Sequence, residues 1–293
     1  MRLYLTGADG MLGTALTAAL AEHPETADWE VRGVSVRDFD IADAAAVRAS
    51  VDAFKPDVVV HTAAHAIVDD LELDPKLALR VNIAGVRNIV EACARNGSRL
   101  VYISSDYVFD GKDTPPGGYR EDDLPNPQSV YGLTKVAGER LAALLDDHLT
   151  VRTSWLFGGV DERLDQVLSI IGHARRGEVS RLIDDQFSAP TYTVDLARAL
   201  AFLLARGEGV TGTIHVTNQG SASWHQVGEY LTARLPGAPT PKAVPLAEWG
   251  FLGGRPVDST LNTDRLRELG WTLPHWQDAV DRFHRSVLQG DRR

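Results

Sequence analysis

Hydrophobic residues in the first half of the chain form short apolar runs, separated by longer stretches with helical spacing. Polar residues hardly interrupt these runs, which is typical of strands buried on both faces. The runs are RLYLTG (2–7), VRGVSV (31–36), DVVVHTA (57–63), RLVYISS (99–105) and LTVRTSW (149–155). Between them, apolar residues recur every three or four positions, which predicts helices over 12–22, 43–54, 75–95 and 129–145.

This alternation of strand and helix predicts a parallel sheet with helices on both faces. We therefore predict an α/β fold, namely a Rossmann-type doubly wound parallel sheet with a smaller C-terminal substrate-binding domain. The alternation weakens near residue 157, and proline and tryptophan gather in LPGAPTPKAVPLAEWGFLGGRP. We place the sheet domain at 1–157 and the second domain at 158–293, with roughly 181–217 returning to the first domain.

Composition excludes several classes of protein. The chain has 293 residues and a formal net charge of −10, and no Lys/Arg cluster stands out. Nucleic-acid binding depends on a basic patch, so we expect no nucleic-acid partner. No apolar run approaches the ~18 residues of a membrane helix, and the beginning MRLYLTGADG has no secretion signal. We expect a cytoplasmic protein without a membrane partner.

Cysteine and histidine could indicate metal or thiol chemistry. Cys93 is the one cysteine, and its place in the helical pattern RNIVEACARNG predicts a small buried apolar residue. His61 and His65, in HTAAH, would suit a metal pair on a helix, but the pattern places them at a strand end that runs into a loop. We therefore predict no metal site, and we expect both histidines to line a cofactor cleft.

The turn after the first strand carries the motif TGADGMLG, with Gly7, Gly10 and Gly13 leading into a helix that begins near Met11. Glycine at these positions lets the backbone turn tightly, approach a pyrophosphate and pack the helix on the sheet, while the helix N-terminus faces the anion. An ordinary glycine-rich turn is the alternative. The strand before the motif and the helix after it are the context that dinucleotide binding requires, so the motif predicts such a site.

The end of the second strand, in VRGVSVRDFD, indicates which dinucleotide is bound. NAD-binding folds usually place an acidic residue there to bind the ribose 2′-hydroxyl, but Ser35 occupies this position. Arg37 follows two residues later, and its guanidinium suits a 2′-phosphate. We therefore predict NADPH. The alternative makes Arg37 a solvated loop charge and gives the ribose to Asp38 or Asp40, which would favour NADH.

The segment YGLTK places Tyr131 and Lys135 one helical turn apart, and Ser105 in SSDYVFDG ends a strand at the edge where ligands bind. Tyr131 is predicted to be the general acid that protonates a carbonyl oxygen as hydride reaches the carbon. A free phenol, pKa ~10, holds its proton too tightly, so we expect Lys135 to lower that pKa and to bind the nicotinamide ribose. Ser105 would hold the carbonyl by hydrogen bond. The alternative for YGLTK is a partly buried tyrosine beside a surface lysine.

Together with TAAHAIVD, RTSWLFG, DDQFSAPT and RPVDSTLN, these motifs resemble the dTDP-4-dehydrorhamnose reductase family of the extended short-chain dehydrogenase/reductase superfamily, in order and in spacing. The resemblance covers nearly the whole chain. It implies an NAD(P)H-dependent oxidoreductase that reduces the 4-keto group of a dTDP-4-dehydro-6-deoxy-L-hexose. That sugar would be dTDP-4-dehydrorhamnose or a related antibiotic deoxysugar, including a branched sugar such as dihydrostreptose. The resemblance is compatible with a homodimer.

The resemblance and the motifs give three sets of expected site residues. The catalytic set is Ser105, Tyr131 and Lys135. The cofactor set is Gly7, Asp9, Gly10, Met11, Leu12, Ser35, Arg37, Asp40, Ile41, Ala63, Ala64 and Lys135. The substrate set is Val68, Ser105, Asp106, Tyr107, Trp155, Arg255 and Ser259.

Three departures from the family pattern lie near the expected sugar pocket. VDERLDQV replaces the usual Asn-Phe, Ser188 stands where glycine is typical, and Ala66 stands where threonine or tyrosine is common. We therefore expect the cofactor chemistry to be retained, and these positions bear on which sugar is bound.

Two other functions remain open from the sequence. An epimerase or 4,6-dehydratase keeps NAD bound, so an acidic ribose ligand would be expected at Ser35; dehydration also needs an acid/base pair, but Asp106 is followed by Tyr107 instead of glutamate. A non-catalytic regulatory subunit would not require an intact catalytic set, although a binding-only protein can retain an old site.

Overall fold

The computed structural model describes residues 1–290 and is built around a six-stranded parallel sheet. The strands are β1 (Arg2–Thr6), β2 (Glu30–Val34), β3 (Val58–His61), β4 (Arg99–Ser105), β5 (His148–Thr153) and β9 (Gly212–His215). Their order in the sheet is β2-β1-β3-β4-β5-β9, so the direction of winding reverses between β1 and β3. Ligands bind at such a switch point, outside the carboxyl ends of the strands. The predicted doubly wound parallel sheet is confirmed.

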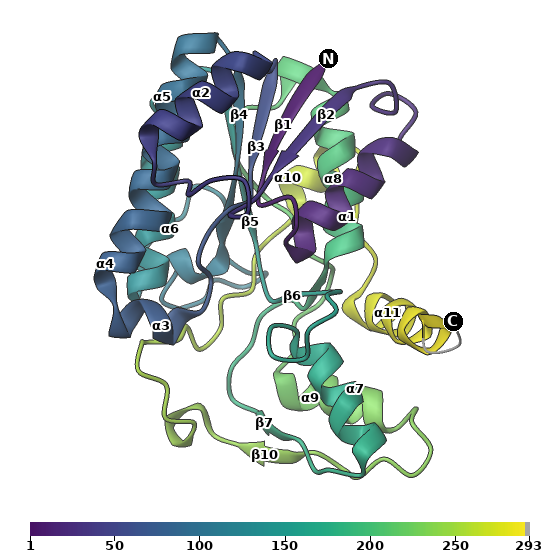
Figure 1. Ribbon diagram of the computed structural model, residues 1–293. Helices are drawn as coiled ribbons and strands as arrows, with labels where there is room; N and C mark the ends of the chain where they lie inside the picture. The colour runs from purple at the N-terminus through teal and green to yellow at the C-terminus, as the bar shows by residue number, and fades with distance from the viewer. Residues whose placement is uncertain (291–293) are drawn as a thin grey trace.

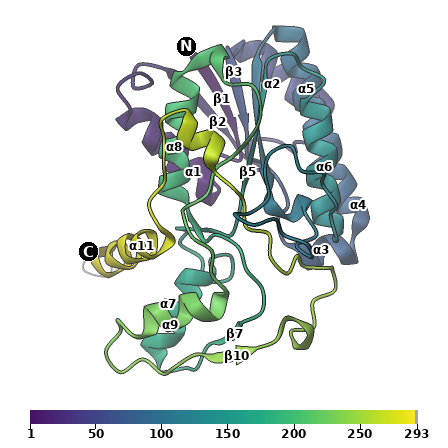
Figure 2. The same ribbon diagram turned by 180° about the vertical axis from the view of Figure 1, so that it is seen from behind.

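Helices cover both faces of the sheet, as Figures 1 and 2 show from opposite sides. One face carries α1 (Met11–Glu22) and α8 (Thr193–Ala205), and the other carries α2 (Ala44–Phe54), α5 (Gly85–Asn96) and α6 (Val130–Ala142). Successive strand residues point to opposite faces, so Leu3 and Leu5 pack toward α1 while Tyr4 packs toward α2. Because both faces are buried, the strands are apolar throughout, which is why the sequence revealed them.

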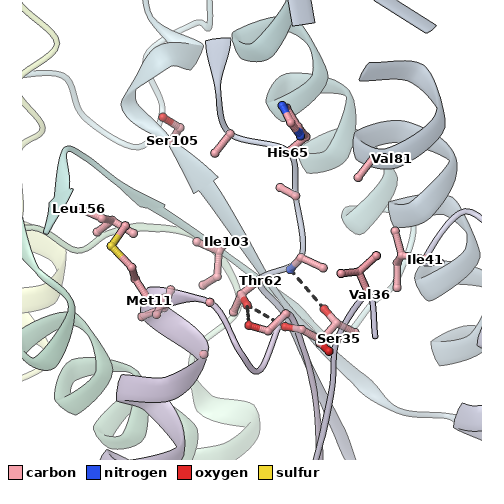
Figure 3. Close-up of a pocket in the computed structure, with 18 of the residues that line it drawn as sticks. Met11, Ser35, Val36, Ile41, Thr62, His65, Val81, Ile103, Ser105 and Leu156 are labelled. Atoms are coloured by element: carbon pink, nitrogen blue, oxygen red, sulfur yellow. Dashed lines mark hydrogen bonds between the residues drawn. The ribbon is translucent and has the colours of Figure 1, made fainter. Parts of the chain in front are cut away.

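The region predicted as one helix over 75–95 is divided into three parts. α4 (Pro75–Ala78) is followed by a π-helical segment, Leu79–Ala84, and only then by α5. A π-helical turn is wider than an α-helical turn and often occurs at functional sites. Here the π-helical segment supplies Arg80 and Val81 to the wall of the cavity shown in Figure 3. The predicted helix is confirmed as one unbroken helical stretch, with a π-helical segment at the part that borders the site. α3 (Val68–Leu73) lies just before α4.

The remaining chain forms a smaller body beyond the carboxyl ends of the strands, at the bottom of Figure 1. It contains α7 (Gln166–Arg176), α9 (Trp224–Thr232), α11 (Trp276–Gly290) and a two-stranded sheet of β7 (Arg181–Ile183) and β10 (Lys242–Val244). β6 (Leu156–Phe157) pairs with β8 (Thr191–Tyr192). β9 belongs to the main sheet, and α8 and α10 (Asp264–Glu268) lie against it. The domain boundary at residue 157 stays a prediction. Among residues 1–290, no helix is long and apolar enough to cross a bilayer.

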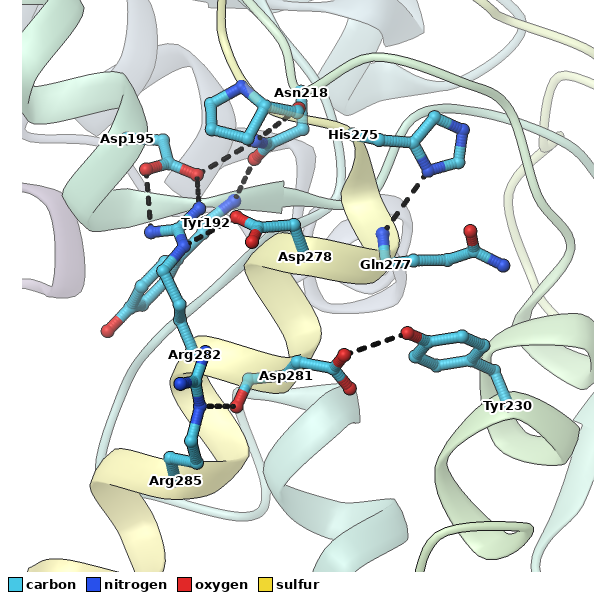
Figure 4. A network of polar contacts seen from close by, with 11 residues as sticks. Tyr192, Asp195, Asn218, Tyr230, His275, Gln277, Asp278, Asp281, Arg282 and Arg285 are labelled. Atoms are coloured by element: carbon cyan, nitrogen blue, oxygen red, sulfur yellow. Dashed lines mark hydrogen bonds and ion pairs between the residues drawn. The ribbon is translucent and has the colours of Figure 1, made fainter.

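A buried ion pair attaches α11 to α8, as Figure 4 shows. Arg282 donates from Nη1 and Nη2 to the two carboxylate oxygens of Asp195, at 2.9 and 2.6 Å. Asp195 is only 5% exposed, and Asn218 donates a further hydrogen bond to it at 2.8 Å. Asn218 also accepts a hydrogen bond from the N–H of Tyr192, so the network joins both helices to β8. Arg282 therefore compensates the negative charge of the buried Asp195 carboxylate.

Replacing Arg282 by methionine should lower the free energy of unfolding by about 3 kcal/mol, because the change leaves a buried carboxylate without its cation. Urea unfolding followed by circular dichroism measures this change. Arg285→Met is the matched control, because Arg285 is exposed on the same helix, and it should change the stability by less than about 0.5 kcal/mol. Equal effects of the two substitutions would contradict the role given to the ion pair.

Candidate active site

A cavity of about 720 Å³ opens at the carboxyl ends of the central strands, where the sheet order reverses (Figure 3). The expected site residues that line it are Gly7, Asp9, Gly10, Met11, Leu12, Ser35, Asp40, Ile41, Ala63, Ala64, Ser105, Tyr131, Lys135 and Trp155. Six expected residues lie outside the lining, namely Arg37, Val68, Asp106, Tyr107, Arg255 and Ser259. The structure thus brings together most of the predicted cofactor set and the whole catalytic set, while their contacts with ligands stay predictions.

The glycine turn after β1 forms one wall of the cavity. Gly7 has a φ of 69°, and a Cβ there would lie 2.7 Å from the Thr62 hydroxyl oxygen. A Cβ on Gly13 would overlap the carbonyl oxygen of Gly7, so the protein itself requires glycine at both positions. Gly10 differs, because a Cβ there would approach only the Gly7 carbonyl oxygen, at 3.2 Å.

The N-terminus of α1 faces the cavity without a side-chain cap. Gly10 is its N-cap residue, and no side chain accepts a hydrogen bond from the first-turn N–H groups. These groups and the helix dipole together favour an anion. Gly10 and the uncapped helix end can therefore hold a pyrophosphate, which needs close approach to the backbone.

The turn after β2 determines which charges are available for a ribose. The N–H of Ser35 donates to the carboxylate of Asp38 at 2.8 Å, and the Ser35 hydroxyl oxygen accepts from the N–H of Arg37 at 3.2 Å. Asp38 is occupied within the turn and does not line the cavity. The Arg37 side chain is 84% exposed, and its Nε lies 3.6 Å from the carboxylate of Asp9, which does line the cavity. An exposed cation next to Asp9 at the cavity edge, without a free carboxylate from Asp38, favours a 2′-phosphate over a 2′-hydroxyl.

One end of the cavity is apolar. Val36, Ile41 and Val81 lie on the same side of it in Figure 3, and Asp40 beside them forms an ion pair with Arg80. An apolar slot of this kind suits a planar base such as adenine. Sequence reasoning missed Arg80 and Val81, because a regular helix gave no reason to turn them toward the site.

The catalytic residues lie at the other end of the cavity, where β4 meets α6. Ser105 ends β4, and Ser129 caps α6 by accepting a hydrogen bond from the N–H of Gly132 at 3.1 Å. This start places Tyr131 in the first turn of α6 and Lys135 in the next. Lys135 is 6% exposed, and its ammonium donates to the carbonyl oxygen of Ile103 at 3.0 Å. The ammonium lies 5.7 Å from the centre of the Tyr131 ring.

Burial dominates the electrostatics of this pair. It raises the pKa of Tyr131 well above its usual value; a hydrogen bond with Ser105 opposes the shift, and the charge of Asp106 adds to it. Burial also lowers the pKa of Lys135 to about 8, opposed by the charge of Glu139 one turn further along α6. The net shift of the Tyr131 pKa is therefore upward, and the lowering expected from Lys135 stays a prediction. The ammonium is bound to a backbone carbonyl, and desolvation of the phenolate outweighs its attraction.

The remaining residues of the substrate set lie behind and beside Ser105. Asp106 is 1% exposed, and serine hydroxyls surround it. The ring of Tyr107 meets the Tyr131 ring edge-on at 5.8 Å, and burial raises the pKa of Tyr107 to about 12. Arg255 is bound to Asp69 of α3 at 2.8 Å. Asp106, Tyr107 and Arg255 do not line the cavity. They can affect a bound ligand only where it extends outside the cavity, or through the residues that do line it.

An aromatic pair closes the substrate end of the cavity. Trp155 has a φ of 42°, which bulky residues seldom adopt and which often marks a functional site. Its indole stacks on that of Trp224 with ring centres 4.5 Å apart and planes 9° apart. Trp224 begins α9, so the stack joins the cavity to the smaller body. No sequence pattern pointed to Trp224, because the pairing depends on a contact between distant segments.

The histidines differ from each other. His65 lines the cavity, and its Nε2 lies 2.8 Å from the carboxylate of Asp70. His61 is 1% exposed, its Nδ1 lies 2.7 Å from the hydroxyl oxygen of Thr6, and burial lowers its pKa to about 3. The expectation that both histidines line the cavity was wrong for His61. Within residues 1–290, no cluster of three or more His, Cys, Asp or Glu side chains has the arrangement of a metal site. Cys93 is buried, as predicted.

Comparisons with known proteins agree with one another over nearly the whole chain. A family model described as the RmlD substrate binding domain matches residues 1–288. The chain is 38% identical over 287 residues to a dTDP-4-dehydrorhamnose reductase of Streptomyces griseus, covering 95% of this chain and 91% of that protein. It is 36% identical over 284 residues to a dTDP-4-keto-6-deoxy-D-glucose reductase of Streptomyces niveus, covering 95% of each.

A solved structure extends this similarity to three dimensions. It is a dTDP-4-dehydrorhamnose reductase of Bacillus anthracis str. Ames in complex with NADP. The two chains superpose with a TM-score of 0.89 at 32% sequence identity, over 97% of this chain and 99% of that one.

The geometry of the glycine turn makes a prediction about Gly10. Gly10→Ala should fold normally and bind a dinucleotide at least about tenfold more weakly, because its methyl group enters the space before the α1 N-terminus. Fluorescence titration with NADPH measures the affinity. Gly209→Ala is the matched control, because a Cβ there meets nothing within 4 Å. Unchanged NADPH affinity in Gly10→Ala would place the pyrophosphate elsewhere.

Proposed function

The chain belongs to the dTDP-4-dehydrorhamnose reductase family, and we propose that it reduces the 4-keto group of a dTDP-4-keto-6-deoxyhexose with NADPH. The observation that carries the proposal is the meeting of Ser105, Tyr131 and Lys135 at the end of a cavity that begins at a glycine turn. The Bacillus anthracis relative in complex with NADP and the exposed Arg37 both support NADPH as the cofactor.

The residues present fit a dinucleotide along the cavity. The uncapped N-terminus of α1 would hold the pyrophosphate, Ser35 and Arg37 the 2′-phosphate, and the apolar slot around Ile41 the adenine. Lys135 would hold the nicotinamide ribose. NADPH, when bound, supplies the hydride that is added to the carbonyl carbon.

Tyr131 would supply the proton that completes the reduction. The ketone gains a hydride at carbon and a proton at oxygen, so it becomes an alcohol while Tyr131 is left as a phenolate that regains a proton from solvent. Because burial raises the pKa of Tyr131 well above its usual value, the phenolate needs a neighbouring cation. Lys135 is the candidate, since its pKa of about 8 leaves it charged at neutral pH.

The smaller body would hold the dTDP-sugar. Trp155 would present an aromatic surface to the sugar. Arg255, Tyr107 and Ser259 would lie toward the nucleotide, Arg255 bound to Asp69 and the buried Ser259 hydroxyl bound to Asp106. Val68 begins α3 next to Asp69, the partner of Arg255. The finer proposal is a 6-deoxy-L-hexose, either dTDP-4-dehydrorhamnose or a related antibiotic deoxysugar, including a branched sugar such as dihydrostreptose.

A turnover assay with purified protein tests this function. The protein is incubated with NADPH and a panel of dTDP-4-keto-6-deoxyhexoses, while the loss of nicotinamide absorbance and the configuration of the product at C4 are followed. We expect oxidation of NADPH with at least one sugar. No oxidation with any sugar of the panel would contradict the proposal and favour a binding or regulatory role.

Tyr131→Phe removes the transferable proton and little else, so it should lower kcat by roughly 10² to 10⁴-fold. The dissociation constant for NADPH should stay unchanged, which a fluorescence titration checks. Near-normal turnover of Tyr131→Phe would show that Tyr131 is not the acid.

Lys135→Met should lower kcat and weaken NADPH binding together, because the ammonium serves both the phenol and the ribose.

Ser35→Asp combined with Arg37→Ala should shift the preference from NADPH toward NADH. The change removes a charge-assisted hydrogen bond worth on the order of 1.5 to 3 kcal/mol and adds a carboxylate that repels a 2′-phosphate. The ratio of kcat/KM for the two cofactors should therefore change at least about tenfold. If the wild type prefers NADH, or if the ratio of kcat/KM values hardly changes, Asp38 or Asp40 is the residue that binds the ribose.

A further inference from the structure

Asp106 is a carboxyl group buried directly behind the catalytic serine. It is 1% exposed and lies next to Ser105 at the end of β4. The hydroxyl groups of Ser188 and Ser259 both contact its Oδ2, at 2.9 and 2.6 Å. The hydroxyl of Ser105 contacts its Oδ1 at 3.0 Å. Three serines from three distant segments of the chain thus converge on one carboxyl group.

The number of protons in this cluster limits what each group can do. Each serine hydroxyl has one proton. Ser188 and Ser259 both point theirs at Oδ2, so that oxygen is an acceptor. The Ser105 oxygen also accepts from the N–H of Tyr107 at 3.2 Å. The single proton of Ser105 can therefore go either to Oδ1 of Asp106 or to a group in the cavity.

The charge of Asp106 determines which of these two bonds Ser105 makes. An ionised carboxylate can only accept, so its Oδ1 takes the proton of Ser105 and leaves none for a substrate carbonyl. A neutral carboxyl group protonated on Oδ1 donates to Ser105 instead. The Ser105 hydroxyl is then free to donate to the carbonyl oxygen that Tyr131 protonates.

We propose that Asp106 is a positioning residue that acts through Ser105: in the productive state it carries a proton on Oδ1, donates it in a hydrogen bond to Ser105, and so directs the Ser105 hydroxyl to the substrate. The proposal rests on the proposed reduction of a carbonyl group. No atom of Asp106 is transferred, and its proton comes from solvent. Ser188 and Ser259 hold Oδ2 in place, so the protonated oxygen is the one that faces Ser105.

The same protonation helps Tyr131. The negative charge of Asp106 contributes to the raised pKa of Tyr131, so a neutral Asp106 makes the phenol a better acid. The free Ser105 hydroxyl and the more acidic Tyr131 both make the neutral form of Asp106 the productive one. Burial raises the pKa of Asp106 itself to about 6, opposed by the hydrogen bonds from Ser259, Ser188 and Ser105.

The other titratable and charged groups around Asp106 come from four elements. Tyr107 follows it in the chain, Tyr131 and Lys135 lie on α6, Arg255 is bound to Asp69 of α3, and Asp258 precedes Ser259. None of them hydrogen-bonds to the Asp106 carboxyl group within the described residues, and its pKa reflects burial and hydrogen bonds. The neutral form exists below this pKa, so kcat should fall as the pH rises through it.

A titration without substrate tests the cluster. Carboxyl carbons are labelled with ¹³C in aspartate, and the signal lost in Asp106→Asn assigns Asp106. Ser188→Ala removes a donor to the charged form, so the midpoint of Asp106 should move upward by about 1 pH unit. Ser169→Ala on α7 is the matched control and should leave the midpoint in place. A midpoint that stays or falls in Ser188→Ala would overturn the assignment.

The pH dependence of turnover tests the catalytic part. Asn at position 106 imitates the neutral acid, because its amide can donate to Ser105 while its oxygen accepts from Ser188 and Ser259. In Asp106→Asn the fall of kcat near the Asp106 midpoint should disappear, and in Ser188→Ala this fall should move upward together with the midpoint. A purely structural residue would change stability without moving the profile.

Two outcomes separate this proposal from the proposed function. If the wild type turns over 4-keto sugars and Asp106→Asn keeps the wild-type pH profile, the role of Asp106 is wrong while the reductase function stands. If no sugar is reduced by the wild type, the proposed function is wrong, and with it the catalytic role of Asp106. In that case the carbon titration still decides whether the three serines hold the carboxylate.

Discussion

Close packing of α6 on β4 is the constraint on which the active site depends. A Cβ on Gly138 would overlap the hydroxyl group of Tyr102, and one on Gly132 would overlap the carbonyl oxygen of Tyr107. Glycine at both positions lets the helix approach the strand, so that Lys135 reaches the carbonyl oxygen of Ile103 at 3.0 Å. The same approach removes water from Tyr131 and Lys135, which explains why their pKa values move in opposite directions.

A second buried ion pair fixes α6 behind the catalytic residues. Arg152 of β5 donates to both carboxylate oxygens of Glu139 at 2.8 Å, and Ser104 donates to Glu139 at 2.6 Å. Breaking such a pair leaves an uncompensated buried charge, so the helix is held to both β4 and β5. Glu139 also lies one turn from Lys135, and its charge opposes the loss of the lysine proton. The fold and the electrostatics of the site thus depend on the same contacts.

Sequence reasoning identified those parts of the fold and site that local pattern determines. The strands are apolar because both faces are buried, and the glycine turn and the Tyr131–Lys135 spacing each belong to one turn and its flanking elements. The π-helical segment, the stack of Trp155 on Trp224 and the serines around Asp106 depend on contacts between distant segments. The direction of the Tyr131 pKa shift was missed for the same reason, because spacing along a helix does not reveal how much water burial removes.

We propose that Tyr131 and its neighbours direct a hydride from NADPH to the 4-keto carbon of a dTDP-sugar. The most direct test uses NADPH carrying deuterium at the transferable position of the nicotinamide, with analysis of the sugar product by proton NMR. We expect one deuterium at C4 of the sugar, with loss of the proton signal at that position alone. Deuterium elsewhere in the sugar, or a product formed without deuterium, would contradict the claim.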